Sequence, residues 1–228
     1  MAGSLPDRVP QKLPRGRHGL PRQFVVRSQR ERMLEATARA VSELGYTGLT
    51  VAAILERAGV SRKTFYEHFS DKEECFLAAY DVVSEGLVRS VSEAFNGRDA
   101  WRDRVHDGLA EFLRVLGAEP DFARMCIVEV LAAGPAALQR RDGVMRTFTV
   151  FFDAGRAEAP PAWELPKLIS EAVVGAIYEL IYARILRNRT EELPDLLPDL
   201  MYIALVPYLG PEQAAIGYRT TAQARRQE

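Results

Sequence analysis

Apolar residues recur every three to four positions along most of this chain, which is the spacing that places them on one face of an α-helix. The pattern is clear from Met33 to Leu44 and stops at Gly45, and glycine or proline marks the later breaks. It predicts helices near residues 24–45, 50–58, 61–69, 71–95, 99–117, 120–132, 135–157, 163–189 and 195–209. Because no stretch alternates as a half-buried strand does and no repeat has a fixed period, the sequence predicts an all-α protein.

Hydroxyl side chains stand where several of these helices begin. Thr50 and Ser61 each precede a short helix, and their oxygens can accept hydrogen bonds from first-turn amides. Ser70 precedes a long helix and Glu73 follows three residues later, which is the spacing of a capping box. We therefore expect helices to start at these three positions.

Changes in composition suggest the domain boundaries. Residues 1–22 are rich in Pro, Gly and Arg and are predicted to be a flexible basic arm. Residues 23–70 are predicted to be a three-helix helix-turn-helix domain. A larger helical domain follows at 71–210, and residues 211–228 are a C-terminal tail.

Charge is distributed unevenly, although the net charge is only −1. The first thirty residues hold 7 basic side chains and 1 acidic one. Residues 1–80 hold 13 basic against 9 acidic side chains, and the rest of the chain holds 17 against 22. A basic front half on an acidic body predicts a localised contact with a polyanion.

The cysteines and the hydropathy pattern bear on the compartment. Cys75 and Cys126 lie in apolar helical patterns without pair spacing, which favours a reducing compartment and no disulfide or zinc site. The most apolar run is interrupted by Glu171, Glu179 and Arg184, and no signal-peptide pattern occurs at the N-terminus. The sequence predicts a cytoplasmic protein without a metal or another cofactor.

Two of the short helices are joined across Gly59 in the layout of a helix-turn-helix, where glycine can supply the left-handed turn conformation. Phe65 and Phe69, at i and i+4, are predicted to pack in the core. Lys63 and Thr64 then lie on the outward face. Residues near the start of such a second helix meet base edges when the helix enters the major groove of DNA.

The outward side chains have suitable chemistry for that contact. Arg62 and Lys63 can donate to guanine or phosphate oxygens, and Tyr66 combines an apolar ring with a hydroxyl. Ser61 leaves helix amides near an anion, and Lys72 can neutralise another phosphate. Read alone, an Arg-Lys pair on a helix is also typical of a solvated face.

The segment from Leu49 to Phe76 closely resembles the N-terminal signature of the TetR family of bacterial transcriptional regulators. The resemblance covers roughly residues 28–78 and is densest in Gly-Val-Ser at 59–61, Thr-Phe-Tyr-Glu-His-Phe at 64–69 and Lys-Glu at 72–73. It implies DNA binding, with the positions that the family uses around DNA occupied by Thr50, Arg62, Lys63, Thr64, Tyr66, His68 and Lys72.

Some roles stay open at this point. His68 either packs or lies near a phosphate, and Glu67 either reads a cytosine amino group or tilts away from DNA. Arg15, Arg17 and Arg22 of the arm either enter a minor groove or belong to a solubilising tail.

Large apolar side chains are concentrated between residues 75 and 157, and the resemblance implies that this region encloses an effector pocket. The candidate lining residues are Trp101, Phe112, Phe122, Met125, Phe148 and Phe152, with ordinary core packing as the alternative. Polar groups that either hold the polar end of a ligand or lie outside are Arg124, Glu129, Arg146, Thr147 and Thr149.

The predicted helix 163–189 is apolar on two sides, so it needs two surfaces to bury against. One is its own domain and the other is a second copy of the chain, since a monomer rarely exposes such a patch. The predicted interface consists of Ile169, Val173, Ile177, Leu180, Leu200 and Ile203. The resemblance implies a four-helix dimer interface at this place.

Together these features predict a homodimeric, sequence-specific DNA-binding transcriptional regulator. We expect a repressor that a small apolar or amphipathic ligand releases from a palindromic operator. The alternatives are a regulator or activator without a small-molecule inducer, controlled by a protein partner, and a ligand-independent architectural protein. Dispersed histidines and the absence of common catalytic motifs argue against an enzyme.

Overall fold

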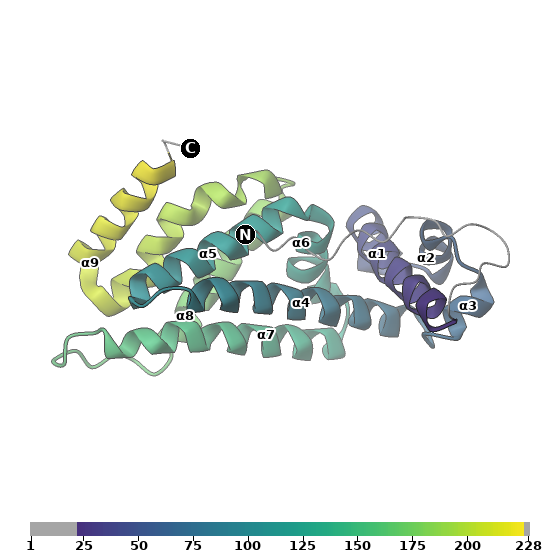
Figure 1. The fold of residues 1–228 in the computed structure, drawn as a ribbon, viewed down its shortest axis with the longest axis horizontal. Helices are drawn as coiled ribbons and strands as arrows, with labels where there is room; N and C mark the ends of the chain where they lie inside the picture. The colour runs from purple at the N-terminus through teal and green to yellow at the C-terminus, as the bar shows by residue number, and fades with distance from the viewer. Residues whose placement is uncertain (1–21, 226–228) are drawn as a thin grey trace.

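The computed structural model describes residues 22–225, and every regular element within them is a helix (Figure 1). The predicted all-α class is confirmed. The α-helices are α1 (Arg22–Gly48), α2 (Val51–Ala58), α3 (Arg62–Tyr66), α4 (Lys72–Asn96), α5 (Trp101–Ala118), α6 (Pro120–Ile127), α7 (Pro135–Asp153), α8 (Ile169–Leu186) and α9 (Leu197–Arg225). The 3₁₀ helices are η1 (Glu129–Ala132), η2 (Ala154–Ala157) and η3 (Thr190–Leu196).

Buried apolar side chains form two clusters, and α4 contributes to both. One cluster joins α1, α2 and α3 to α6 and to the first half of α4, including Phe76 and Tyr80. The other fills the body formed by α5, α7, α8, α9 and the second half of α4, including Leu87 and Phe95. The 25 residues of α4 span about 38 Å at 1.5 Å per residue. A single long helix therefore connects the N-terminal unit to the body (Figure 1).

The start of α4 lies one residue later than the sequence suggested. Asp71 is the N-cap, and its carboxylate accepts from the Glu74 amide at 2.9 Å. The Glu74 carboxylate accepts from the amide and hydroxyl of Ser70, at 2.6 and 2.7 Å. These hydrogen bonds lower the pKa of Glu74. The start of α4 therefore resembles a capping box, but Asp71 is the N-cap in place of the expected Ser70, and Glu74 in place of Glu73 reaches back, to Ser70 one residue before the cap.

The expected helix 163–189 is shorter at both ends. Pro166 lies in the expected first turns, which are not helical, and a proline inside a helix has no amide to donate and clashes with the preceding turn. At the other end Asn188 adopts a left-handed conformation, with a φ of 55°, which stops the helix. The expected helix 120–132 likewise divides into α6 and η1.

The residues expected to form a C-terminal tail are helical as far as the structure describes them. Gly210, with a φ of 80°, kinks α9, and the helix continues through Pro211 to Arg225. Proline is favourable in the first turn of a helix, so the Gly-Pro pair both ends one segment and starts the next. The second segment packs on the first, since Gly217 lies against Leu205. α1 similarly continues across a kink at Gly45 to Gly48.

Trp101 holds three parts of the body together. Its ring lies edge-on to Tyr208 of α9 at 5.1 Å, and its Nε1 donates to the Phe151 carbonyl of α7 at 3.0 Å. The ring also covers Gly155 so closely that a Cβ built there would lie 2.2 Å from Trp101 Cζ2. Only glycine fits at this position.

Gly155→Ala is therefore expected to lower the free energy of unfolding by about 1–3 kcal/mol, because the ring or the backbone must shift. Chemical denaturation measures this change. Gly143→Ala is the matched control in the same part of the chain, since its Cβ would meet only Arg146 Nη2, at 4.0 Å. We expect the control to be neutral or stabilising, as Gly-to-Ala changes inside helices are. Equal stability of both variants would contradict the packing role of Trp101.

Within residues 22–225, no helix has the length and apolar character needed to cross a membrane.

Candidate DNA-binding face and effector cavity

Local capping fixes the geometry of α2 and α3. The Thr50 hydroxyl accepts from the Ala53 amide at 3.1 Å, which makes Thr50 the N-cap of α2. Gly59 closes α2 in the left-handed conformation, with φ 63° and ψ 39°, and donates its amide to Leu55 at 2.9 Å. Ser61 is the N-cap of α3 and accepts from the Thr64 amide at 3.1 Å. The predicted helix-turn-helix is thus formed from the predicted capping residues.

The two faces of α3 differ sharply. Phe65 is fully buried and Phe69 is almost so, and both contribute to the N-terminal core as predicted. Arg62, Lys63 and Tyr66 are exposed, with Tyr66 keeping 51% of its surface accessible. Because the buried rings fix the rotation of this short helix, two cations and a phenol project together on the outward side.

The Lys72 side chain, which was predicted to neutralise a DNA phosphate, instead contacts the end of α1. Its Nζ donates to the carbonyl of Leu49, just after α1, at 2.8 Å, and to the carbonyl of Tyr46, in the last turn of α1, at 3.4 Å. The ammonium also lies 5.0 Å from the centre of the Tyr46 ring. His68 is half-buried, with its ring 6.2 Å from the Phe69 ring, which fits the packing role more closely than an outward one. Glu67 is exposed.

The proposed arm lies mostly outside the described residues. Arg15 and Arg17 belong to the part of the chain that the structure does not describe. Arg22 is the first residue of α1, so the helix begins at the last position assigned to the arm.

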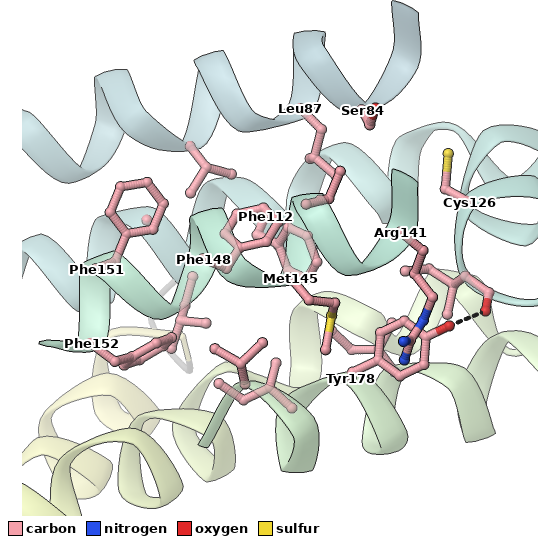
Figure 2. A pocket seen from close by; sticks show the side chains of 18 of the residues that line it. Ser84, Leu87, Phe112, Cys126, Arg141, Met145, Phe148, Phe151, Phe152 and Tyr178 are labelled. Atoms are coloured by element: carbon pink, nitrogen blue, oxygen red, sulfur yellow. Dashed lines mark hydrogen bonds between the residues drawn. The ribbon is translucent and has the colours of Figure 1, made fainter. Parts of the chain in front are cut away.

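A cavity of about 80 Å³ lies in the body between α4, α5, α6, α7 and α8 (Figure 2). Three of the predicted lining residues, Phe112, Phe148 and Phe152, do line it. Most other lining groups are aliphatic or aromatic, among them Leu87, Val91, Phe95, Leu109, Met145, Phe151, Val174, Ile177 and Ile181. The cavity is therefore suited to an apolar ligand.

The other three predicted lining residues lie elsewhere. Trp101 packs between Gly155 and Tyr208, as described above. Phe122 and Met125 face the N-terminal cluster, because α6 turns that side toward α1 and the first part of α4. Helical spacing identified these side chains as buried, but it does not distinguish a packed core from a cavity wall.

Arg141 also lines the cavity, which the sequence did not predict. It is the one charged side chain among the described lining residues. Its guanidinium lies 4.3 Å from the centre of the Tyr178 ring. Tyr178 donates its hydroxyl to the Ile127 carbonyl at 2.5 Å, and burial raises its pKa. Burial also raises the pKa of Cys126 to about 12, so this lining thiol stays protonated.

The polar groups considered from the sequence lie outside the cavity wall. Arg146 and Thr147 are exposed on α7, and Thr149 bonds back to its own helix. Arg124 and Glu129 pair with each other at 3.3 Å. The sequence signal that could have found Arg141 is its spacing: Met145, Phe148 and Phe152 follow it at i+4, i+7 and i+11 on one helix face.

Glu129 links the body to the N-terminal unit. Its carboxylate accepts from the Tyr46 amide at 2.9 Å, directly after the kink at Gly45. Glu129 follows α6, whose residues Cys126 and Ile127 line the cavity. The last turn of α1, which leads into α2, is thus bonded to a segment adjoining the cavity.

Three of the six residues predicted for a dimer interface are buried inside the protomer. Val173, Ile177 and Leu200 retain 5% exposure or less, and Ile177 faces the cavity. They cannot contact a second copy unless the protomer opens. Ile169, Leu180 and Ile203 are partly buried.

The outer side of α8 is formed by other residues. Ala172, Gly175 and Ala176 are exposed, and a Cβ built at Gly175 would meet nothing within 4 Å. Leu186 and, on α9, Tyr202 are exposed large side chains. We call this surface, which also carries the exposed Glu179 and has Leu180 and Ile203 at its edge, the α8–α9 face.

The fold and these two sites define a class: an all-α protein with an N-terminal helix-turn-helix and a helical body that contains an apolar cavity. Residues 33–79 match the family model described as bacterial regulatory proteins, tetR family. The N-terminal part of the chain is therefore similar to this family.

Similar proteins include named transcriptional repressors. The transcriptional repressor AcnR of Corynebacterium diphtheriae is 34% identical over 121 residues, which cover 49% of this chain and 63% of AcnR. The class C tetracycline repressor protein of Escherichia coli is 29% identical over 157 residues, covering 66% of this chain and 65% of that protein. The chain therefore spans less than two thirds of the length of these curated relatives.

Among solved structures, FadR of Bacillus subtilis in complex with stearoyl-CoA has a TM-score of 0.68 at 15% identity, covering 79% of this chain and 98% of that one. The fatty acid degradation regulator FadR of Bacillus halodurans has a TM-score of 0.69, also at 15% identity, with 79% and 94% covered. At this identity the likeness concerns the fold alone.

Proposed function

We propose that this protein is a sequence-specific DNA-binding transcriptional regulator, a repressor that leaves its operator when a small apolar or amphipathic ligand fills the cavity. The observation that carries the proposal is the outward side of α3, where Arg62, Lys63 and Tyr66 project from a helix held by two buried phenylalanines. Side chains of these types contact phosphates and base edges in the major groove.

Tyr66→Ala tests the DNA contact. We expect operator affinity to fall by about 1–3 kcal/mol, because an exposed ring and hydroxyl at the interface are lost while the core is untouched. Fluorescence anisotropy on operator DNA, located first by genome-wide footprinting, measures this change. Tyr218→Ala removes a similarly exposed tyrosine from α9 and is expected to bind normally. Unchanged affinity in folded Tyr66→Ala would show that α3 does not read DNA.

A second copy of the chain is the partner that we propose for the α8–α9 face. Two-fold pairing through this face would present two α3 helices to DNA, and the operator would then be an inverted repeat. Exposed alanines and glycine allow the two α8 helices to approach closely, and exposed Leu186 and Tyr202 add apolar area.

The cavity supports an effector-controlled regulator over one that a protein partner controls. A ligand that prefers a protein conformation in which the α3 helices fit the operator poorly lowers the affinity for DNA. By linkage, DNA lowers the affinity for that ligand by the same factor. At about 80 Å³ the cavity is smaller than the engineered 150 Å³ cavities that hold benzene, so most ligands must widen it. Widening would act on α4 and α6, the helices that also hold the N-terminal unit.

A further inference from the structure

The cavity has one polar end. Figure 2 shows Arg141 and Tyr178 at one end, Phe151 and Phe152 at the other, and Met145 with aromatic rings between them. Arg141 and Phe152 stand 11 positions apart on α7, which corresponds to about 16 Å at 1.5 Å per residue. The lining of the cavity thus extends about 16 Å along α7, with a cation at one end only.

The hydrogen bonds of Arg141 are incomplete. Nη1 donates to Asp142 at 2.9 Å, but the buried Nε has no acceptor among the described residues. A guanidinium offers five N–H donors, and its fork matches the two oxygens of a carboxylate. Asp142 is largely exposed to solvent, so its hold on the guanidinium is weak.

A cavity of this form selects among ligand classes. A cationic head group would be repelled by the guanidinium. A neutral one could accept a hydrogen bond from Arg141 Nε but would leave the positive charge without a counter-charge, which makes the bond weaker. Lining residues at both ends, about 16 Å apart along α7, favour an elongated ligand over a compact one. An anion at the end of a single apolar chain satisfies both ends.

We propose that the effector is a single-chain carboxylate, such as a fatty acid, with its carboxylate on Arg141 and its alkyl chain extending toward Phe152. This inference rests on the proposed function, since it names the ligand class for the proposed effector cavity. The separation of about 16 Å along α7 suits a chain of roughly a dozen carbons, because an extended alkyl chain advances by about 1.3 Å per carbon.

The test is direct binding of dodecanoate to the full chain by calorimetry, compared with its neutral analogue dodecan-1-ol. We expect dodecanoate to bind roughly tenfold or more tightly than the alcohol, as a charge-assisted hydrogen bond allows. In Arg141→Gln the preference should fall to within about twofold while the alcohol binds as before. Arg141→Lys, which keeps the charge and the aliphatic stem, should retain part of the preference.

Two neighbouring variants serve as controls. Arg140→Gln removes the adjacent arginine, which pairs with Asp81 at 2.9 and 3.0 Å and does not line the cavity. It should leave the preference unchanged. Asp142→Asn removes the carboxylate that competes for Arg141 and should tighten dodecanoate binding.

The outcomes separate this inference from the proposed function. Three results would overturn the carboxylate assignment. The protein could bind acid and alcohol equally, or it could bind dodecanoyl-CoA tightly but not dodecanoate. The third is an unchanged preference for the acid in folded Arg141→Gln. Operator binding, measured separately without ligand, tests the regulator itself. Normal operator binding with no dodecanoate binding would overturn the ligand class and leave the DNA-binding proposal intact.

Discussion

Ala176→Glu is expected to convert the protein from dimers to monomers and to lower its operator affinity by roughly 10²–10⁴-fold, the advantage that linking two binding modules provides. Ala176 is exposed on the outer side of α8, so a protomer accommodates the longer side chain without repacking. In a dimer the same carboxylate would be buried against its symmetry mate, which is strongly unfavourable for an unpaired charge. Sedimentation velocity and operator titration measure the two effects.

Val150→Glu is the control for this prediction, because Val150 is a 63% exposed apolar residue on α7, outside the α8–α9 face. It should remain dimeric and bind DNA normally. Ile177→Asp is not a useful probe of the interface, since Ile177 is only 5% exposed and we expect its replacement to unfold the protomer. A dimeric Ala176→Glu protein together with a monomeric Val150→Glu protein would place the interface on α7.

The helix-turn-helix could be predicted from the sequence because its determinants are local. Gly59 ends α2 and Ser61 begins α3 through hydrogen bonds to residues within four positions, so the sequence contains the whole motif. Phe65 and Phe69 then fix which side is buried. Tertiary packing confirms these assignments without changing them.

The two sides of α8 could not be assigned in the same way. The helix is apolar all round, so a helical wheel offers no single inner side. The larger side chains, such as Ile177 and Val173, are buried within the protomer, whereas the small ones, such as Ala176, remain exposed. Which side faces the body depends on α7 and α9, which are distant in sequence.

Cavity-lining residues were the hardest to predict. A side chain that lines a cavity differs from one in the packed core only in having no atoms in contact on one side. Trp101 and Phe112 look alike in the sequence, yet one covers Gly155 and the other lines the cavity. Arg141 was not among the residues that the sequence predicted for the cavity. Only the packing of α7 against α8 places it over Tyr178.

The contact between Glu129 and Tyr46 offers a way to separate the two halves of the molecule. Glu129→Ala removes the acceptor of the Tyr46 amide and the partner of Arg124, two groups in a largely buried region. Breaking a buried pair of this kind costs about 3 kcal/mol, a large fraction of the 5–15 kcal/mol that stabilises a typical domain. We expect the free energy of unfolding to fall by about that amount.

The change should also be local, which distinguishes it from a general loss of stability. The last turn of α1 leads into α2, so its loosening should speed hydrogen exchange at the Tyr46 amide before exchange in α5 or α7 changes. Operator affinity should fall as well, because the two α3 helices are then held less rigidly relative to the body. Glu129→Gln, which keeps a carbonyl oxygen to accept from Tyr46, should preserve slow exchange while losing the charge pair with Arg124. If exchange at Tyr46 in Glu129→Ala matches the unmodified protein, the hydrogen bond does not hold α1 to η1, and the packing of α1 against α4 and α6 is sufficient to join the N-terminal unit to the body.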